Sequence, residues 1–211
     1  MKRIRIMGLA LATAFALMAV FAGTAMSAGK VLVAKTAGKG ELKTGEELRA
    51  ESSDLVFVTS SGNLECSSNI LVGTVGVNGA PKDKGPINTE SSTGKESGNL
   101  CKTTTALGPA EIKSEHLPWS AEFNTKGIST VKGKKVTFTS TFPNAGGAKC
   151  TYEAAKVVAT FNTSGVVTET VTNQVFKGNK KTSNPACPSE GKLSGHFSLF
   201  SGLEAIESEV K

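Results

Sequence analysis

Four cysteines are the residues of this chain whose type and spacing most clearly indicate chemistry, and that chemistry is cross-linking. They are Cys66, Cys101, Cys150 and Cys187. None belongs to a C-x-x-C pair, which argues against a zinc ribbon and a thioredoxin-type redox site. Four cysteines allow three pairings, between which sequence alone does not choose. We expect sequential pairing, which closes two loops of similar span. In the chain-entropy model each bridge stabilises the folded state by up to about 4 kcal/mol.

Residues for acid–base catalysis are scarce. The histidines are His116 and His196, and the aspartates are Asp54 and Asp83. A Ser-His-Asp triad would have to use one of these histidines, and no G-x-S-x-G nucleophile elbow occurs. His116 precedes Leu117-Pro118, and His196 alternates with the apolar residues of a predicted strand. We therefore expect both histidines at the solvated surface. The sequence predicts no catalytic residue and a protein that is not an enzyme.

Metal and phosphate sites are not indicated either. No H-E-x-x-H motif and no acidic loop with EF-hand spacing occurs, so we predict no metal and no cofactor. Gly94-Lys95 resembles the end of a phosphate-binding loop, but Thr89 and Glu96 stand where that motif needs Gly and Ser or Thr. Trp119 shares an alternating face with Phe123, so we expect it in the core rather than as a sugar platform.

The charge of the chain is mildly basic. The formal net charge is +6, and it falls to +3 once Lys2, Arg3 and Arg5 leave with a predicted signal peptide. That charge does not predict nucleic-acid binding, although it allows loose attraction to an anionic cell-wall polymer. Basic residues gather at 132–135 and 177–181, both at predicted turns. We expect them to protect strand edges and aid solubility, with an anion-binding end as the alternative.

Residues 1–28 have the order of a secretory signal peptide. A basic head is followed by an uncharged run from Ile6 to Phe21 and a small-residue tail ending at Ala28. The run has 16 residues, short of the ~20 that a spanning helix needs. We therefore expect a signal helix cleaved after Ala25 or Ala28. The mature protein is expected to be secreted or in the cell envelope, without stable membrane insertion, where disulfides persist.

Alternating apolar and polar residues predict strands through most of the mature chain. The clearest are 119–124, 136–142 and 193–199. Gly202 is expected to turn the chain into a last strand over 203–210. Hairpins are expected at Lys132–Lys134, between strands 128–131 and 136–142, and at Asn162–Gly165, between strands 156–161 and 166–176.

These strands predict an all-β fold, an antiparallel β-sandwich stapled by disulfides, with a small closed β-barrel as the alternative. We divide the chain into the signal peptide (1–28), an N-terminal extension or first strand (29–53) and a single β domain (54–211). Only 45–52 could form a helical turn. The stretch 78–99 is rich in Gly, Ser and charge and contains Pro81 and Pro86, so we expect it to be a flexible loop.

Four short motifs, spread from residue 64 to the C-terminus, resemble those of a known group of proteins. The motifs are Leu64-Glu65-Cys66, Leu117-Pro118-Trp119, Cys150-Thr151-Tyr152 and Leu193-Ser194-Gly195. Together they resemble a loose group of secreted, uncharacterised, β-rich, four-cysteine proteins of soil actinobacteria. The resemblance implies an exported bacterial β-fold and supplies no catalytic residues.

Three functions follow as hypotheses. The first is a non-catalytic exported protein that binds or packs against cell-envelope material. The second is a secreted hydrolase, because two of the glutamates could converge as paired carboxylates; it requires a cleft where Glu115 or Glu122 meets His116. The third is a small-ligand binder inside a barrel, which requires an interior void lined by Phe side chains.

Overall fold

The computed structural model describes residues 32–36 and 40–211. The predicted signal peptide and its cleavage site lie outside the described residues. The regular secondary structure of the described residues is β-strand, apart from one short 3-10 turn at Pro143–Ala145. None of their helical segments is long or apolar enough to cross a membrane.

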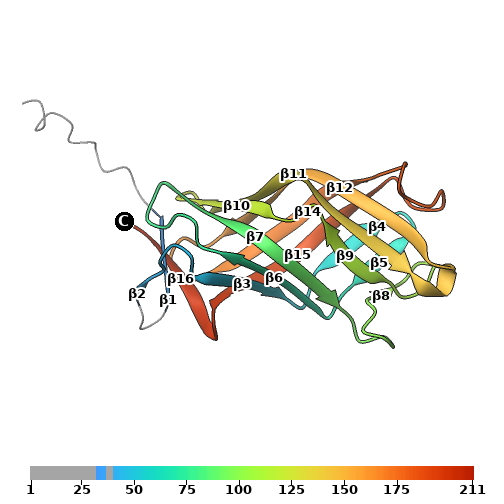
Figure 1. The fold of residues 1–211 in the computed structure, drawn as a ribbon, viewed down its shortest axis with the longest axis horizontal. Coiled ribbons are helices and arrows are strands. Elements are labelled where there is room, and N and C mark those ends of the chain that lie inside the picture. Colours follow the sequence, from blue (N-terminus) through green and yellow to red (C-terminus); the bar gives the residue numbers. More distant parts are fainter. Residues whose placement is uncertain (1–31, 37–39) are drawn as a thin grey trace, which may run out of the picture.

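Eight antiparallel strands close into a barrel (Figure 1). Around the barrel they run β14-β12-β11-β10-β7-β6-β3-β15, and pairing of β15 with β14 closes the ring. Their bounds are β3 Glu47–Ser52, β6 Ser68–Thr74, β7 Lys82–Thr93, β10 Trp119–Asn124, β11 Ile128–Phe142, β12 Ala148–Phe161, β14 Thr168–Gly178 and β15 Glu190–Ser201.

The all-β, antiparallel, disulfide-stapled fold is confirmed, and its architecture is the barrel that we gave as the alternative to a sandwich. Both architectures show the same alternation of buried and exposed residues, so the sequence pattern does not separate them. A sheet closes into a barrel only if its strands bend and twist. Register shifts between Lys132 and Val136, between Val171 and Gln174, and between Val72 and Gly73 mark irregularities of the kind that bend and twist strands.

Shorter strands lie at the two ends of the barrel (Figure 1). At one end, which we call the sheet end, β16 pairs with β1 and β13, and β1 pairs with β2. At the other, the disulfide end, β4 pairs with β5, β5 with β8, and β9 with β11. The bounds are β1 Leu32–Thr36, β2 Gly40–Glu41, β4 Val56–Thr59, β5 Gly62–Glu65, β8 Lys102–Thr103, β9 Glu111–Glu115, β13 Gly165–Val166 and β16 Glu204–Val210.

Two bridges staple the disulfide end. Cys66 is bonded to Cys101 and Cys150 to Cys187, which confirms sequential pairing. The hairpin at Asn162–Gly165 and the last strand after Gly202 are confirmed as well.

The expected flexible loop at 78–99 is wrong, because most of it is β7, a full strand of the barrel wall. Its outward residues are charged or polar, and its inward residues include Asp83, Gly85 and Ile87, so it carries little of the apolar signal of a strand. Pro86 is tolerated in the middle of the sheet because it lies beside the register shift at Gly73, where the ladder is already broken.

Two further expectations are wrong for related reasons. Residues 45–52 form no helical turn: β3 occupies 47–52, with Leu48 and Ala50 directed into the barrel. Residues 132–134 form no hairpin, because β11 runs without a break from Ile128 to Phe142. The Gly–Lys signal there marks a bulge inside one long strand, and bulges share their composition with turns.

Candidate functional site

The barrel interior holds a cavity of about 230 Å³. Its lining extends from Leu64 near the disulfide end to Ser208 at the sheet end. Strand alternation directs every second side chain inward, and most of these side chains are apolar. Rings recur among them: Phe57, Phe123, Phe138, Phe161, Phe176 and Phe197. The void lined by Phe side chains that a small-ligand barrel requires is therefore present.

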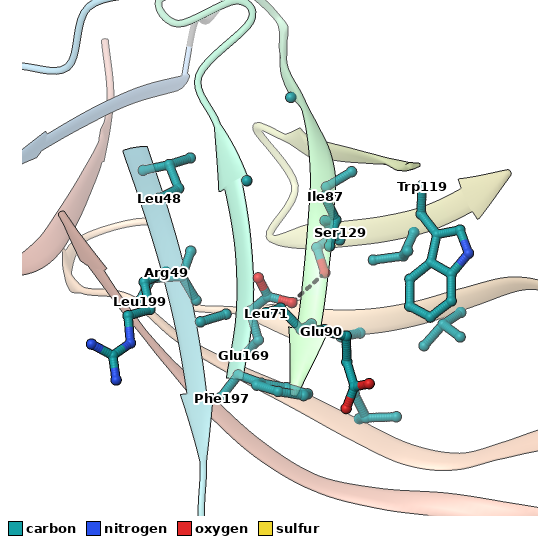
Figure 2. Close-up of a pocket in the computed structure, with 18 of the residues that line it drawn as sticks. Leu48, Arg49, Leu71, Ile87, Glu90, Trp119, Ser129, Glu169, Phe197 and Leu199 are labelled. Atoms are coloured by element: carbon teal, nitrogen blue, oxygen red, sulfur yellow. Dashed lines mark hydrogen bonds between the residues drawn. The ribbon is translucent and has the colours of Figure 1, made fainter. Parts of the chain in front are cut away.

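One carboxyl group lies inside this apolar space. Glu169, on β14, is 9% exposed, and its Oε2 accepts a hydrogen bond of 2.8 Å from the Ser129 hydroxyl on β11 (Figure 2). Burial raises the pKa of Glu169 to about 7, and the bond from Ser129 opposes that rise. Glu169 is therefore an acid that changes its charge near neutral pH, inside the cavity.

A second buried carboxyl group belongs to β7. Asp83 is 6% exposed, and its Oδ1 accepts a bond of 3.3 Å from the backbone N–H of Ala80. Its Oδ2 is buried and has no hydrogen-bond partner among the described residues. Burial raises the pKa of Asp83 to about 6, against the backbone bonds from Ala80 and Gly79. A buried, unpaired carboxylate oxygen is costly, so it calls for a functional explanation.

The register places Asp83 and Ser129 in one row of the wall. Asp83 on β7 lies opposite Phe123 on β10, and Phe123 lies opposite Ser129 on β11. With neighbouring strands ~4.8 Å apart, Asp83 and Ser129 are two strand spacings apart. Glu169 lies two residues after Val167, which immediately precedes β14 and donates its backbone N–H to the carbonyl of Ile206 on β16. Both carboxyl groups therefore lie in the half of the cavity nearest the sheet end.

A third acid, Glu90, lines the cavity from the other half of β7. The Ser92 hydroxyl lies within hydrogen-bond distance of both Glu90 and Asn69 Oδ1, the latter at 2.9 Å, and these two acceptors share its one hydrogen. Unlike Asp83, Glu90 is thus tied into a polar chain of the wall. That chain continues through a weak bond of 3.5 Å from Asn69 Nδ2 to the carbonyl of Ser52.

The cationic residues at the cavity wall turn away from the interior. Arg49 alternates with the inward Leu48 and Ala50, and its guanidinium pairs with Glu51 at 2.7 Å. In Figure 2 this guanidinium lies on the far side of β3 from Glu169. Lys84 alternates with Asp83 and is exposed. The interior of the described barrel therefore contains carboxyl groups and no opposing cation.

Trp119 forms part of the cavity wall on β10, and its side chain is 6% exposed. Its Nε1 donates a bond of 3.2 Å to the backbone carbonyl of Glu115. The predicted burial of Trp119 is confirmed. As the one Trp of the chain, it gives the cavity a built-in fluorescence reporter.

Both histidines lie at the surface, as predicted. His196 Nδ1 is 2.7 Å from Asp54 Oδ2, and its backbone N–H donates to Asp54 Oδ1 at 2.9 Å. Burial acts to raise the pKa of Asp54, but the bonds from His196 and Ser52 outweigh it and lower the pKa. Among the described residues, no hydroxyl bonds the other ring nitrogen of His196, so this pair lacks the nucleophile of a triad.

The residues required by the hydrolase hypothesis have separate partners. Glu115 Oε1 accepts a bond of 2.5 Å from the Thr139 hydroxyl. Glu122 pairs with Lys132 at 2.5 Å, and that bond holds the Glu122 pKa below its usual range. His116 is exposed and bonds neither glutamate.

The two basic segments lie on either side of β12: residues 132–135 belong to β11, and residues 177–181 lie at and just after the end of β14. Glu153 of β12 accepts bonds from Lys135 and from Asn179, so it connects residues 132–135 to residues 177–181. The bond from Lys135, reinforced by Asn179, holds the pKa of Glu153 below its usual range despite partial burial. Lys132, Lys135 and Lys177 are paired with glutamates, so this surface is less positive than its lysine content indicates.

No group of histidine, cysteine and acidic residues that could hold a metal ion occurs among residues 32–36 and 40–211. Comparison with known proteins adds no assignment: no family model matches the chain, and neither the curated proteins nor the solved structures include a significant match.

Sequence reasoning did not find Glu169, Ser129 and Asp83 as a group. A signal existed for the first two, because Glu169 and Ser129 have the inward phase of Val171 and Val131 on their strands. A polar residue on an apolar phase is the sequence signature of a buried polar site. Asp83 carried no such signal, because its segment has no apolar alternation.

Proposed function

We propose that the protein binds a small, largely apolar molecule inside the barrel. The observation that carries this proposal is the cavity of about 230 Å³, walled by Phe and aliphatic side chains. An eight-stranded barrel is just wide enough to be filled by its own side chains or to hold one small ligand. Natural cores are packed with few voids larger than a water molecule, so a void of this size supports the second use.

The size of the ligand follows from the volume. A cavity of ~150 Å³ lined by aliphatic and aromatic side chains holds benzene. Scaling to about 230 Å³ gives a ligand of roughly nine non-hydrogen atoms, if its packing is similar. A medium-chain aliphatic molecule or a substituted single ring fits that size. Fused-ring cofactors and long-chain lipids are too large for the cavity in this conformation.

The place of action belongs to the same proposal. Two disulfides are consistent with an oxidising, extracellular environment, and the first 28 residues have the order of a signal peptide. We infer that the protein is exported and meets its ligand outside the cytoplasm or in the envelope. Intact-mass measurement of the protein recovered from culture medium tests this, since cleavage after Ala25 or Ala28 predicts two defined masses.

Trp119 provides the direct test of binding. Titration of the purified, oxidised protein with octan-1-ol should change the Trp119 emission in a saturable way, because Trp119 lines the cavity. Ala121→Trp, which places a large ring on the inward face of the same strand, should block the cavity and abolish saturation. Val58→Trp, at an exposed position, serves as the matched control. Non-saturable quenching that is equal in all three proteins would refute the proposal.

A second candidate is attachment to an anionic envelope polymer. The specific observation is that residues 132–135 and 177–181 meet around Glu153, and Lys134, Lys180 and Lys181 are exposed there without an ion pair among the described residues. Pull-down on purified cell wall at low and high salt tests it. Absence of retention at low salt excludes it, whatever the outcome for the cavity.

A further inference from the structure

The polar groups of the cavity narrow the class of ligand, provided that the barrel binds a small molecule as proposed above. We propose that this ligand is an amphipathic amine: its ammonium group donates hydrogen bonds to Glu169, and its apolar body lies along the Phe-lined barrel axis. Three features of the cavity support this assignment: the sign of the interior charge, the geometry at Glu169 and the unsatisfied oxygen of Asp83.

The sign of the interior charge selects against an anionic ligand. Glu169, Asp83 and Glu90 line the cavity, while Arg49 and Lys84 face outward. A fatty acid or another carboxylate would bring its charge into a low-dielectric space that holds acids and no cation, and like charges there repel strongly. An ammonium group supplies the missing opposite charge, which is the usual condition for burying a carboxylate.

The geometry at Glu169 suits a donor from the ligand. Ser129 fixes one carboxylate oxygen with its 2.8 Å bond. The residues directly opposite Glu169 on the adjacent strands are Phe161 on β12 and Phe197 on β15, so neither strand brings a charged side chain to it. Burial raises its pKa and the Ser129 bond lowers it, and no charged side chain of the described strands adds to these two influences. The remaining acceptor capacity of the carboxylate therefore faces the cavity (Figure 2).

Asp83 supplies the second, independent observation. Its Oδ2 is buried without a hydrogen-bond partner among the described residues, and Asp83 lines the same half of the cavity as Ser129. An ammonium group has three donors. Glu169 takes one or two of them, and the unpartnered oxygen of Asp83 adds a second acceptor and a second negative charge to the same half of the cavity. An ammonium group bound at Glu169 thus compensates the charge of Glu169 directly and that of Asp83 at longer range.

A neutral ligand is the main competitor. If Glu169 stays protonated, it can donate a hydrogen bond to an alcohol or a carbonyl group, and no cation is needed. The two cases differ in their dependence on pH. A primary amine of the lysine type has a pKa near 10.4 and stays charged from pH 5 to 9, so its affinity follows the ionisation of Glu169 and, in smaller part, of Asp83. An alcohol binds without this dependence.

The experiment compares three eight-carbon ligands that differ in their polar group: octylamine, octan-1-ol and octanoate. Dissociation constants are measured by calorimetry and by Trp119 fluorescence at pH 8, and again at pH 5.5. The proteins are wild type, Glu169→Gln, Asp83→Asn and, as a matched control, Glu111→Gln, which changes an exposed acid of β9 outside the cavity lining.

We expect octylamine to bind wild type at least tenfold more tightly than octan-1-ol at pH 8, and octanoate to bind most weakly. Glu169→Gln should reduce the affinity for octylamine at least tenfold and leave that for octan-1-ol within about twofold, which also shows that the variant is folded. Octylamine affinity should fall about thirtyfold from pH 8 to 5.5, because the pKa of Glu169 is about 7 and the affinity follows its ionised fraction. Glu111→Gln should match wild type.

The outcomes separate the two proposals. If none of the three ligands binds, the cavity proposal itself fails. If octan-1-ol binds as tightly as octylamine, or octanoate binds best, the cavity binds ligands but the amine assignment is wrong. If the amine preference survives Glu169→Gln and disappears in Asp83→Asn, the assignment to Glu169 is overturned.

Discussion

The two ends of the barrel are built in different ways. At the disulfide end, Cys66–Cys101 and Cys150–Cys187 fix the chain covalently, and a cluster of rings packs edge to face around Phe57, with Phe138, Tyr152 and Phe176 at 4.8–6.0 Å between centroids. At the sheet end, hydrogen-bonded strands of two to seven residues meet the wall, and the buried acids Glu169 and Asp83 lie among the rings of Phe123, Phe161 and Phe197.

This difference separates stability from function. Covalent closure and aromatic packing stabilise a fold without requiring polar groups to change state. A buried carboxyl group costs stability, and proteins keep such groups chiefly at functional sites. We therefore assign most of the stability to the disulfide end and binding, with any opening, to the sheet end. Three predictions test that contrast.

The largest effect is expected at the disulfide end. Replacing Cys150 and Cys187 together by Ser removes a bridge that spans 37 residues, for which the chain-entropy model gives a loss of about 4 kcal/mol in the free energy of unfolding. Urea unfolding of the two proteins measures it. Neither cysteine lines the cavity, so ligand affinity in the folded variant should stay within twofold of wild type. A loss below 1 kcal/mol would contradict the assignment of stability to this end.

The second effect is a gain in stability at the sheet end. Glu169 has a pKa of about 7 in the folded protein against 4.5 for an ordinary glutamate. The folded state therefore holds its proton more tightly, and stability falls as pH rises from about 4.5 through 7. Above that window the difference between the two pKa values corresponds to a cost of about 3 kcal/mol. Glu169→Gln removes the cost.

Urea unfolding at several pH values measures this gain. Glu169→Gln should equal wild type in stability near pH 4 and exceed it by up to about 3 kcal/mol at pH 8. Glu111→Gln, at an exposed position, should follow wild type at every pH. A Glu169→Gln variant that is less stable than wild type at pH 8 would mean that burying the Glu169 carboxylate costs no stability. It would contradict the assignment of function to the sheet end.

Local sequence patterns predict most of the strands and both disulfides, but these predictions fail where a strand is polar or bent. The alternation around Trp119 and Phe197 is enough to place β10 and β15, because one face of each strand meets the core and the other meets water. β7 has no such contrast, since its inward positions are Asp83, Gly85 and Ile87. Its neighbours β6 and β10 define it as a strand, and those pairings are long-range.

The candidate site is still less visible in the sequence. A cavity is what remains after eight strands have closed, so no single segment carries its signature. Glu169 illustrates the limit: its phase on β14 marks it as buried, but only the closed ring shows that Ser129 lies across from it on β11, 40 residues away. The same ring shows that no cation from the described strands reaches it.

The smallest predicted effect tests what holds the sheet end in place. Asn78 connects β1 to the chain beside the barrel through three bonds: its Oδ1 accepts from the Ala34 N–H at 2.8 Å, and its Nδ2 donates to the carbonyls of Ala34 and Leu42 at 2.9 and 2.8 Å. Asn78→Ala should cost about 2 kcal/mol, since each net bond contributes about 1 kcal/mol or less. Asn88→Ala, at an exposed position of β7, is the control.

The location of the loss matters more than its size. Because the bonds of Asn78 lie at the sheet end alone, hydrogen exchange should accelerate at Ala34 and Leu42 and stay unchanged along β11 and β12. Ligand association and dissociation should both quicken, with little change in affinity, if this end is where the ligand passes. Faster exchange around Phe57 and Tyr152 instead would show that the two ends unfold as one unit. That result would contradict the assignment of stability to one end and binding to the other.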